Sequence, residues 1–170
     1  MKRSVSIVLF LLFVLGGVSH AWDGNRKGFI AGIGLGGGQT DFGADYTGVL
    51  TNFKLGFAPS NQLLLYWHST VVFFEDDFVE DIWIDGMGGL SAEYHFIDKP
   101  RNSLYGILGL GYHNVANTDE GDNEMGFGVR VGLGFEFLRH VSIEATLMKG
   151  FNDEPYDSMV MGVSLNVLGY

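Results

Sequence analysis

The feature that most constrains this 170-residue chain is an alternation of apolar residues with small or polar ones that recurs eight times. Strict alternation is typical of a β-strand with two different faces, because successive side chains of a strand point to opposite sides. The alternating segments are residues 29–35, 48–57, 62–73, 82–96, 104–113, 126–137, 141–148 and 159–168. The chain is therefore predicted to be all-β, with eight strands.

The charged residues inside these segments all share one face. Six Asp, Glu, Lys and Arg residues lie in these segments, and all of them are on the face opposite the apolar series. They are Lys54, Asp85, Glu93, Arg130, Glu136 and Glu144. Random placement would do this about once in 64 tries, so the two faces must contact different surroundings.

The second face is a poor surface for water, because it consists largely of glycine, with few charges and with bulky residues such as Trp83 and Tyr105. A membrane barrel inverts the usual arrangement: apolar side chains face lipid, and small and polar ones face the lumen. Glycine beside large side chains suits a narrow lumen that is filled by side chains. The alternation thus predicts an eight-stranded antiparallel up-and-down transmembrane β-barrel.

The links between the predicted strands divide into two groups. Those after the first, third, fifth and seventh strands are expected to be long loops, and they hold 14 of the 20 carboxylates; they are 36–47, 74–81, 114–125 and 149–158. The other links, 58–61, 97–103 and 138–140, are expected to be short turns. Barrels of this kind have short periplasmic turns and longer extracellular loops. We therefore expect acidic extracellular loops and periplasmic termini.

A separate segment precedes the barrel. Lys2 and Arg3 are followed by an apolar run over 5–18 and by Ser19-His20-Ala21, which has small residues at the two positions that a signal peptidase requires. The run is too short for the roughly 20 apolar residues of a membrane-spanning helix. We predict a secretory signal peptide over 1–21 and the barrel over 22–170.

The glycine- and aromatic-rich strands GFIAGIGLGGG and GFGVRVGLGFEF, with the final Tyr170, resemble the small outer-membrane β-barrel proteins of the OmpA/OmpX-like and opacity-like group. This resemblance implies a surface or structural protein of the bacterial outer membrane, in some members an adhesin. It also implies outer-membrane lipid and lipopolysaccharide as surroundings, and recognition of the C-terminal strand by the barrel-assembly machinery.

One detail departs from that group, whose last strand usually ends in an aromatic residue in phase with its apolar series. Here the apolar series over 159–167 is one residue out of phase with Tyr170. A bulge at Gly169 is expected to bring the two into phase.

The charges of the lumen face predict an internal network, because unpaired charges in a narrow interior cost several kcal/mol. Arg130 is expected to reach Glu144 or Glu93. The full set of predicted lumen residues is Lys54, Glu93, Arg130, Glu136, Glu144, Tyr66, His68 and Tyr105. We expect this network to plug the barrel; a narrow passive channel is the alternative.

Composition argues against several other functions. A net charge of −10 disfavours nucleic acid as a partner, and the absence of cysteine excludes thiolate chemistry. A lipid A-modifying acyltransferase or deacylase remains a weaker alternative, and the deacylase type needs His and Ser together on the lipid face. His68, His95 and His113 fall on the lumen face, and Ser69 on the lipid face has no His beside it. No catalytic residue and no cofactor are predicted.

The acidic loops offer oxygen donors but not the spacing of a dedicated calcium loop. The residues considered for weak cation contact are Asp76, Asp77, Asp119, Glu120, Asp122 and Glu124. Solvated loops are the expected structure, no metal site is predicted, and the sequence does not identify an extracellular ligand.

Overall fold

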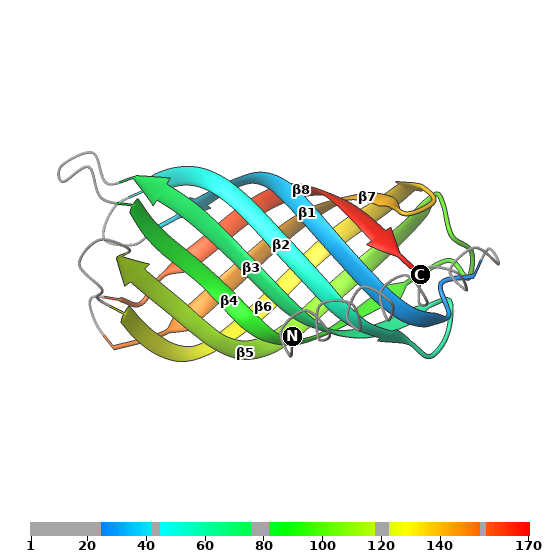
Figure 1. Ribbon diagram of the computed structural model, residues 1–170, viewed down its shortest axis with the longest axis horizontal. Coiled ribbons are helices and arrows are strands. Elements are labelled where there is room, and N and C mark those ends of the chain that lie inside the picture. The colour runs from blue at the N-terminus through cyan, green and yellow to red at the C-terminus, as the bar shows by residue number, and fades with distance from the viewer. Residues whose placement is uncertain (1–24, 42–44, 76–81, 118–122, 154–155) are drawn as a thin grey trace, which may run out of the picture.

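The computed structural model describes residues 25–41, 45–75, 82–117, 123–153 and 156–170 (Figure 1). The predicted signal peptide lies outside these residues and stays a prediction. The described chain forms eight strands: β1 (Gly28–Thr40), β2 (Tyr46–Ala58), β3 (Leu63–Glu75), β4 (Ile82–His95), β5 (Ser103–Asn117), β6 (Asn123–Leu138), β7 (Val141–Phe151) and β8 (Met159–Gly169).

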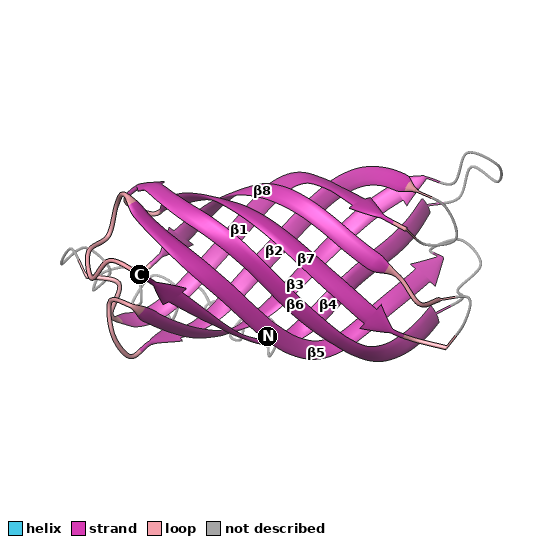
Figure 2. Ribbon diagram, turned by 180° about the vertical axis from the view of Figure 1, so that it is seen from behind, coloured by secondary structure: helices cyan, strands magenta, loops and turns pink. Residues whose placement is uncertain are grey.

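The strands form one closed barrel in which each strand pairs antiparallel with the next along the chain. β1 closes the barrel by pairing with β8, and Ala31 lies opposite Gly169. All eight strands run obliquely to the long axis (Figure 2). The predicted eight-stranded antiparallel barrel is confirmed, and closure gives every strand a paired neighbour on both sides.

The two faces of the wall point as the alternation predicts. Large apolar side chains are exposed on the outside, for example Ile33 and Leu108, each 65% exposed. The six charged residues of the predicted alternating segments are all buried inside. Such an exterior is stable in hydrocarbon rather than in water. The described residues contain no helix that is both long and apolar enough to cross a membrane.

The lumen is less polar than the sequence suggests. It holds one buried apolar cluster of Ile30, Ala58, Leu64, Tyr66, Leu168 and Tyr170. A second cluster consists of Leu50, Val72, Phe74, Met87, Met148 and Val160. The lumen accepts both kinds of side chain because it must be filled, and glycines leave the room. At Gly128, for instance, an added Cβ would lie only 3.1 Å from Cβ of His113.

Four strands extend at least three residues beyond a predicted end. β1 continues to Thr40, β5 to Asn117 and β7 to Phe151, while β6 begins already at Asn123. The expected contrast in link length is therefore wrong: link 96–102 is as long as link 152–158. Backbone pairing does not depend on hydrophobic side chains, so the ladder continues through glycine and polar residues beyond the apolar run.

We call the end of the barrel with links 59–62, 96–102 and 139–140 the turn end, and the opposite end the loop end. The C terminus lies at the turn end (Figures 1 and 2).

Candidate functional site: the filled lumen

Four buried charged residues lie close together inside the barrel, and we call them the central ion-pair layer: Lys54 on β2, Glu93 on β4, Arg130 on β6 and Glu144 on β7. Lys54 Nζ lies 3.0 Å from Glu93 Oε2 and also bonds Glu144. Arg130 Nη2 lies 3.5 Å from Glu144 Oε2. Of the two carboxylates predicted for Arg130, the structure places Glu144 in contact with it.

Two phenols donate to the same carboxylate oxygens that Lys54 binds. Tyr66 donates a hydrogen bond of 3.2 Å to Glu93, and Tyr105 one of 2.7 Å to Glu144. Lys54 Nζ also lies 5.1 Å from the centre of the Tyr66 ring. Each carboxylate thus accepts from a cation and from a phenol, the arrangement that lets buried charges be tolerated.

The two histidines near this layer differ from the sequence prediction. His95, which was not predicted, lies with Nε2 2.8 Å from Glu93 Oε1 and with Nδ1 3.1 Å from Ser103 Oγ. His68, which was predicted, instead pairs through Nδ1 with Ser91 Oγ at 2.9 Å. The alternation identifies which side chains face inward but says nothing of which strands place them at the same height.

Glu136, another predicted member, lies in a different group at the turn end. Its Oε2 accepts from Arg26 Nη2 at 2.5 Å and from Arg26 Nε at 2.9 Å. Arg26 is fully buried and also donates to the carbonyl groups of Asn61, at 2.8 Å, and Lys99, at 2.7 Å. One guanidinium therefore joins β6 to the links 59–62 and 96–102 at this end.

Sequence reasoning missed Arg26 because it precedes the first alternating segment, so no periodicity marks it. The only available signal was its position: a single arginine directly ahead of a strand, in a chain whose lumen carries more carboxylates than cations.

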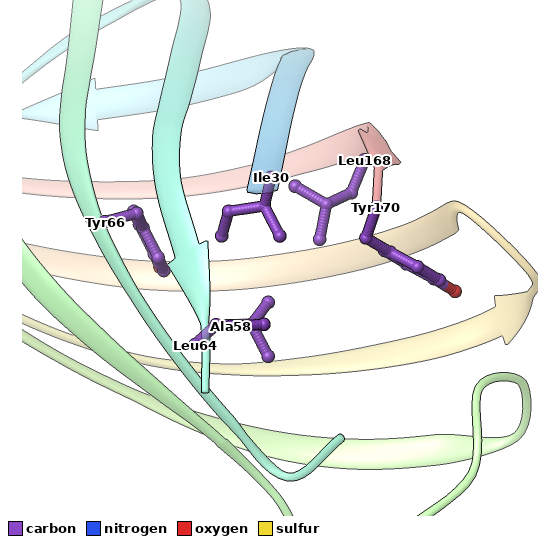
Figure 3. Close-up of a cluster of buried hydrophobic side chains, with 6 residues drawn as sticks. All are labelled: Ile30, Ala58, Leu64, Tyr66, Leu168 and Tyr170. Atoms are coloured by element: carbon purple, nitrogen blue, oxygen red, sulfur yellow. The ribbon is translucent and has the colours of Figure 1, made fainter. Parts of the chain in front are cut away.

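Tyr170 is the second partner of Glu136, and Figure 3 shows its ring within the apolar cluster at the turn end. Its hydroxyl donates to Glu136 Oε1 at 2.5 Å. The expected bulge at Gly169 is wrong, since β8 pairs with β1 without a register shift. Tyr170 keeps the phase of Leu168 and is only 3% exposed. Burial, with the hydrogen bond to Glu136, raises the pKa of Tyr170.

The turn between β6 and β7 supports this inward position. The register shift of the barrel falls there, between Glu136 and Leu138. His140 adopts a left-handed conformation, with φ of 69°, where glycine is usual. Its ring lies 4.4 Å from that of Tyr170, and its Nδ1 lies 2.8 Å from the Leu168 carbonyl oxygen. These contacts give the side chain a role that glycine lacks.

Another buried polar group lies towards the loop end. His113 Nε2 is 2.8 Å from Asp85 Oδ1, and Thr40 donates to Asp85 Oδ2 at 2.5 Å. Ser158 Oγ also approaches His113 Nε2, at 3.5 Å, while Nδ1 faces Asn152 Oδ1 at 3.0 Å. A nucleophilic triad needs the acid and the serine on different ring nitrogens. Here both lie at Nε2 and all three side chains are fully buried, so the group is not arranged for catalysis.

The acidic loop residues considered for cation contact are mostly beyond what the structure describes. Asp76, Asp77, Asp119, Glu120 and Asp122 lie outside the described residues. Glu124 belongs to β6, and its backbone carbonyl accepts from Asn152 Nδ2 at 3.2 Å. Among the described residues, no three His, Asp or Glu side chains are grouped as a metal site requires.

Comparison with solved structures identifies the architecture. Over 84% of this chain, Neisserial surface protein A superposes with a TM-score of 0.65 at 16% identity, with 97% of its own chain covered. The chain has the fold of the small eight-stranded outer-membrane barrels. The N-terminal β-barrel domain of Pseudomonas aeruginosa OprF matches with a TM-score of 0.52 at 17% identity, over 84% of this chain and 99% of its own. Ail, the attachment invasion locus protein of Yersinia pestis, matches with a TM-score of 0.51 at 18% identity, over 85% of this chain and 98% of its own. No family model and no curated protein matches the sequence.

Proposed function

We propose that this chain is an integral surface protein of the bacterial outer membrane, with a lumen plugged by side chains and a structural or binding role. The observation that carries the proposal is the inverted barrel, with exposed Leu, Ile, Val and Phe outside and paired charges inside. The fold that it shares with outer-membrane barrels supports the same location.

Fractionation of cells with detergent tests the location. We expect the mature chain in the outer-membrane fraction, with an electrophoretic migration that changes on boiling as the barrel unfolds. Recovery of the native protein in the soluble periplasmic fraction would contradict the proposal.

The proposed orientation has both termini in the periplasm and the acidic loop end outside the cell. The two-residue link 139–140 at the turn end supports it, because outer-membrane barrels have short periplasmic turns. The exposed carboxylates of the loop end then face outward; they are Asp41, Asp45, Glu75, Asp153 and Asp157. An epitope inserted in link 41–45 should be detected on intact cells, and one inserted in link 96–102 only after permeabilisation. The reverse pattern would refute this orientation.

A plugged lumen distinguishes this proposal from a narrow passive channel. The central ion-pair layer, the two apolar clusters and Arg26 all occupy the interior. Purified protein in a planar bilayer should therefore give no stable single-channel steps. Reproducible steps from pure protein would favour the channel.

The enzymatic alternative lacks support on the lipid face. His68, His95 and His113 are all buried in the lumen, so none is placed to activate Ser69 toward a lipid. Purified barrel incubated with labelled lipopolysaccharide should leave its acyl chains unchanged.

Assembly is proposed to use β8. The inward position of Tyr170 changes what that strand offers to the assembly machinery: its exposed row is Met161, Val163, Leu165 and Val167 rather than the final aromatic ring. The role of outer-membrane lipid and lipopolysaccharide as the surroundings of the barrel follows from the proposed location.

A further inference from the structure

The exposed basic residues of the described chain all gather at the turn end. They are Lys27, Lys99, Arg101 and Arg139, which we call the basic rim. The other described Lys and Arg side chains are committed elsewhere: Arg26, Lys54 and Arg130 are buried, and Lys149 pairs with Asp157 at the loop end. Asp98 is the one exposed carboxylate described at the turn end. The rim is thus positive in a protein that is strongly acidic as a whole.

No member of the basic rim forms an ion pair with a described residue. The rim also does not hold the fold together through its side chains, since the turn contact of Lys99 uses its backbone carbonyl. These four cations remain available to an external partner.

Apolar side chains border the same residues. Phe96 and Ile97, 57% and 47% exposed, begin the link that carries Lys99 and Arg101, and exposed Leu138 directly precedes Arg139. Exposed apolar side chains followed directly by basic residues are typical of a protein surface at the edge of a lipid leaflet. There, the long basic side chains reach the phosphate groups of the lipids.

The backbone at Arg101 has a conformation that is unusual for arginine. Arg101 has φ of 79°, in the left-handed region that favours glycine or asparagine. Two other non-glycine residues share this region: Asn102 is of a type that tolerates it, and His140 has the side-chain contacts described above. Arg101 precedes Asn102 in the turn before β5, so the turn imposes this conformation on two consecutive residues, and the Arg101 side chain forms no ion pair with a described residue.

We propose that the basic rim is a binding surface for the phosphate headgroups of anionic phospholipids in the leaflet at the turn end. This inference rests on the proposed function, because it requires the barrel to span a bilayer. The opposite charge of rim and headgroup identifies the partner, and the bordering apolar side chains favour a lipid over a soluble anion.

Lipid selectivity tests the proposal directly. The full-length mature barrel is refolded into vesicles of phosphatidylcholine, and the motionally restricted fraction of spin-labelled phosphatidylglycerol is compared with that of spin-labelled phosphatidylcholine. We expect phosphatidylglycerol to be preferred about threefold at low salt, with the preference falling as salt is added. The K99Q/R101Q/R139Q variant, which keeps only Lys27 of the rim, should lose most of the preference, whereas K149Q, matched in chemistry but at the loop end, should keep it.

Arg101→Gly separates lipid binding from folding. Glycine relieves the backbone at this position, so the variant should unfold at an equal or higher urea concentration while it loses part of the lipid preference. Equal preference in wild type and triple variant would overturn the proposal. Tight binding of polyphosphate by the detergent-solubilised barrel without lipid selectivity would also overturn it, in favour of a soluble anion. Failure to enter vesicles at all would instead contradict the proposed function.

Discussion

Two regions of the lumen fill the same barrel by different means. The central ion-pair layer depends on charge: Lys54 bonds two carboxylates, and the loss of either sign leaves the other uncompensated. The apolar cluster around Leu50, Met87 and Met148 depends on shape, since its members contribute no polar contact. The comparison teaches that the barrel wall requires its interior to be filled, and that either paired charges or apolar side chains can fill it.

Removal of Lys54 should have the largest effect. In Lys54→Met, Glu93 and Glu144 remain buried with Arg130 as their only nearby cation of the layer, and we expect a loss of about 3–5 kcal/mol in the free energy of unfolding. Urea denaturation in detergent micelles, followed by tryptophan fluorescence, measures it. The K54M/E93Q variant leaves Arg130 with Glu144 alone and should recover much of the lost stability. If Lys54→Met were as stable as wild type, the central ion-pair layer would have to be hydrated.

Truncation in the apolar cluster should cost somewhat less. Leu50 is 1% exposed, so Leu50→Ala leaves a cavity and should lower the free energy of unfolding by about 3 kcal/mol. The same denaturation assay applies. Leu50→Met conserves volume and is the control, with a loss expected below about 1.5 kcal/mol. If the two variants behaved alike, the cluster would be loosely packed.

Glu136→Gln tests the turn end. The amide retains the size of the carboxylate but not its charge, so buried Arg26 loses its ion pair. We expect a loss of about 2 kcal/mol, as for a hydrogen bond to a charged group. Conductance of the same variant in a planar bilayer is a second measurement: it should stay closed, because the central ion-pair layer is intact. Channel steps would mean that the lumen is closed by the Arg26–Glu136 ion pair and not by the central ion-pair layer.

Tyr170→Phe should have the smallest effect. The ring can keep its position beside His140, and the lost hydrogen bond to Glu136 should cost about 1 kcal/mol. Because the pKa of Tyr170 is raised in the fold, its stabilising effect is complete below the ordinary tyrosine pKa of about 10 and declines above it. The difference between wild type and variant should therefore narrow as pH rises beyond 10 in denaturation curves. A constant difference would mean that Tyr170 ionises as readily in the fold as in the unfolded chain.

Tyr170 also shows how much was available from the sequence and how a family pattern misled. The phase of the series 159–167 already assigns Tyr170 to the lumen, but the aromatic end of related barrels favoured a bulge. The structure follows the phase, because a bulge would sacrifice the pairing with β1 and the bond to Glu136.

The partners inside the lumen were beyond sequence reasoning for a different reason. Asp85 and His113 each face inward by their phase, and Arg26 belongs to no strand. Their contacts join residues up to 110 positions apart along the chain. Which inward residues meet depends on the stagger of all eight strands, which alternation does not record.

The sequence by itself determined the eight strands and the direction of the side chains within the alternating segments, because an antiparallel wall between lipid and a narrow interior requires a period of two. Only the tertiary structure decided which inward charges pair, that Arg26 and Tyr170 complete the turn end, and how far the strands extend. Those outcomes depend on the register around a closed barrel, which is a property of all the pairings together.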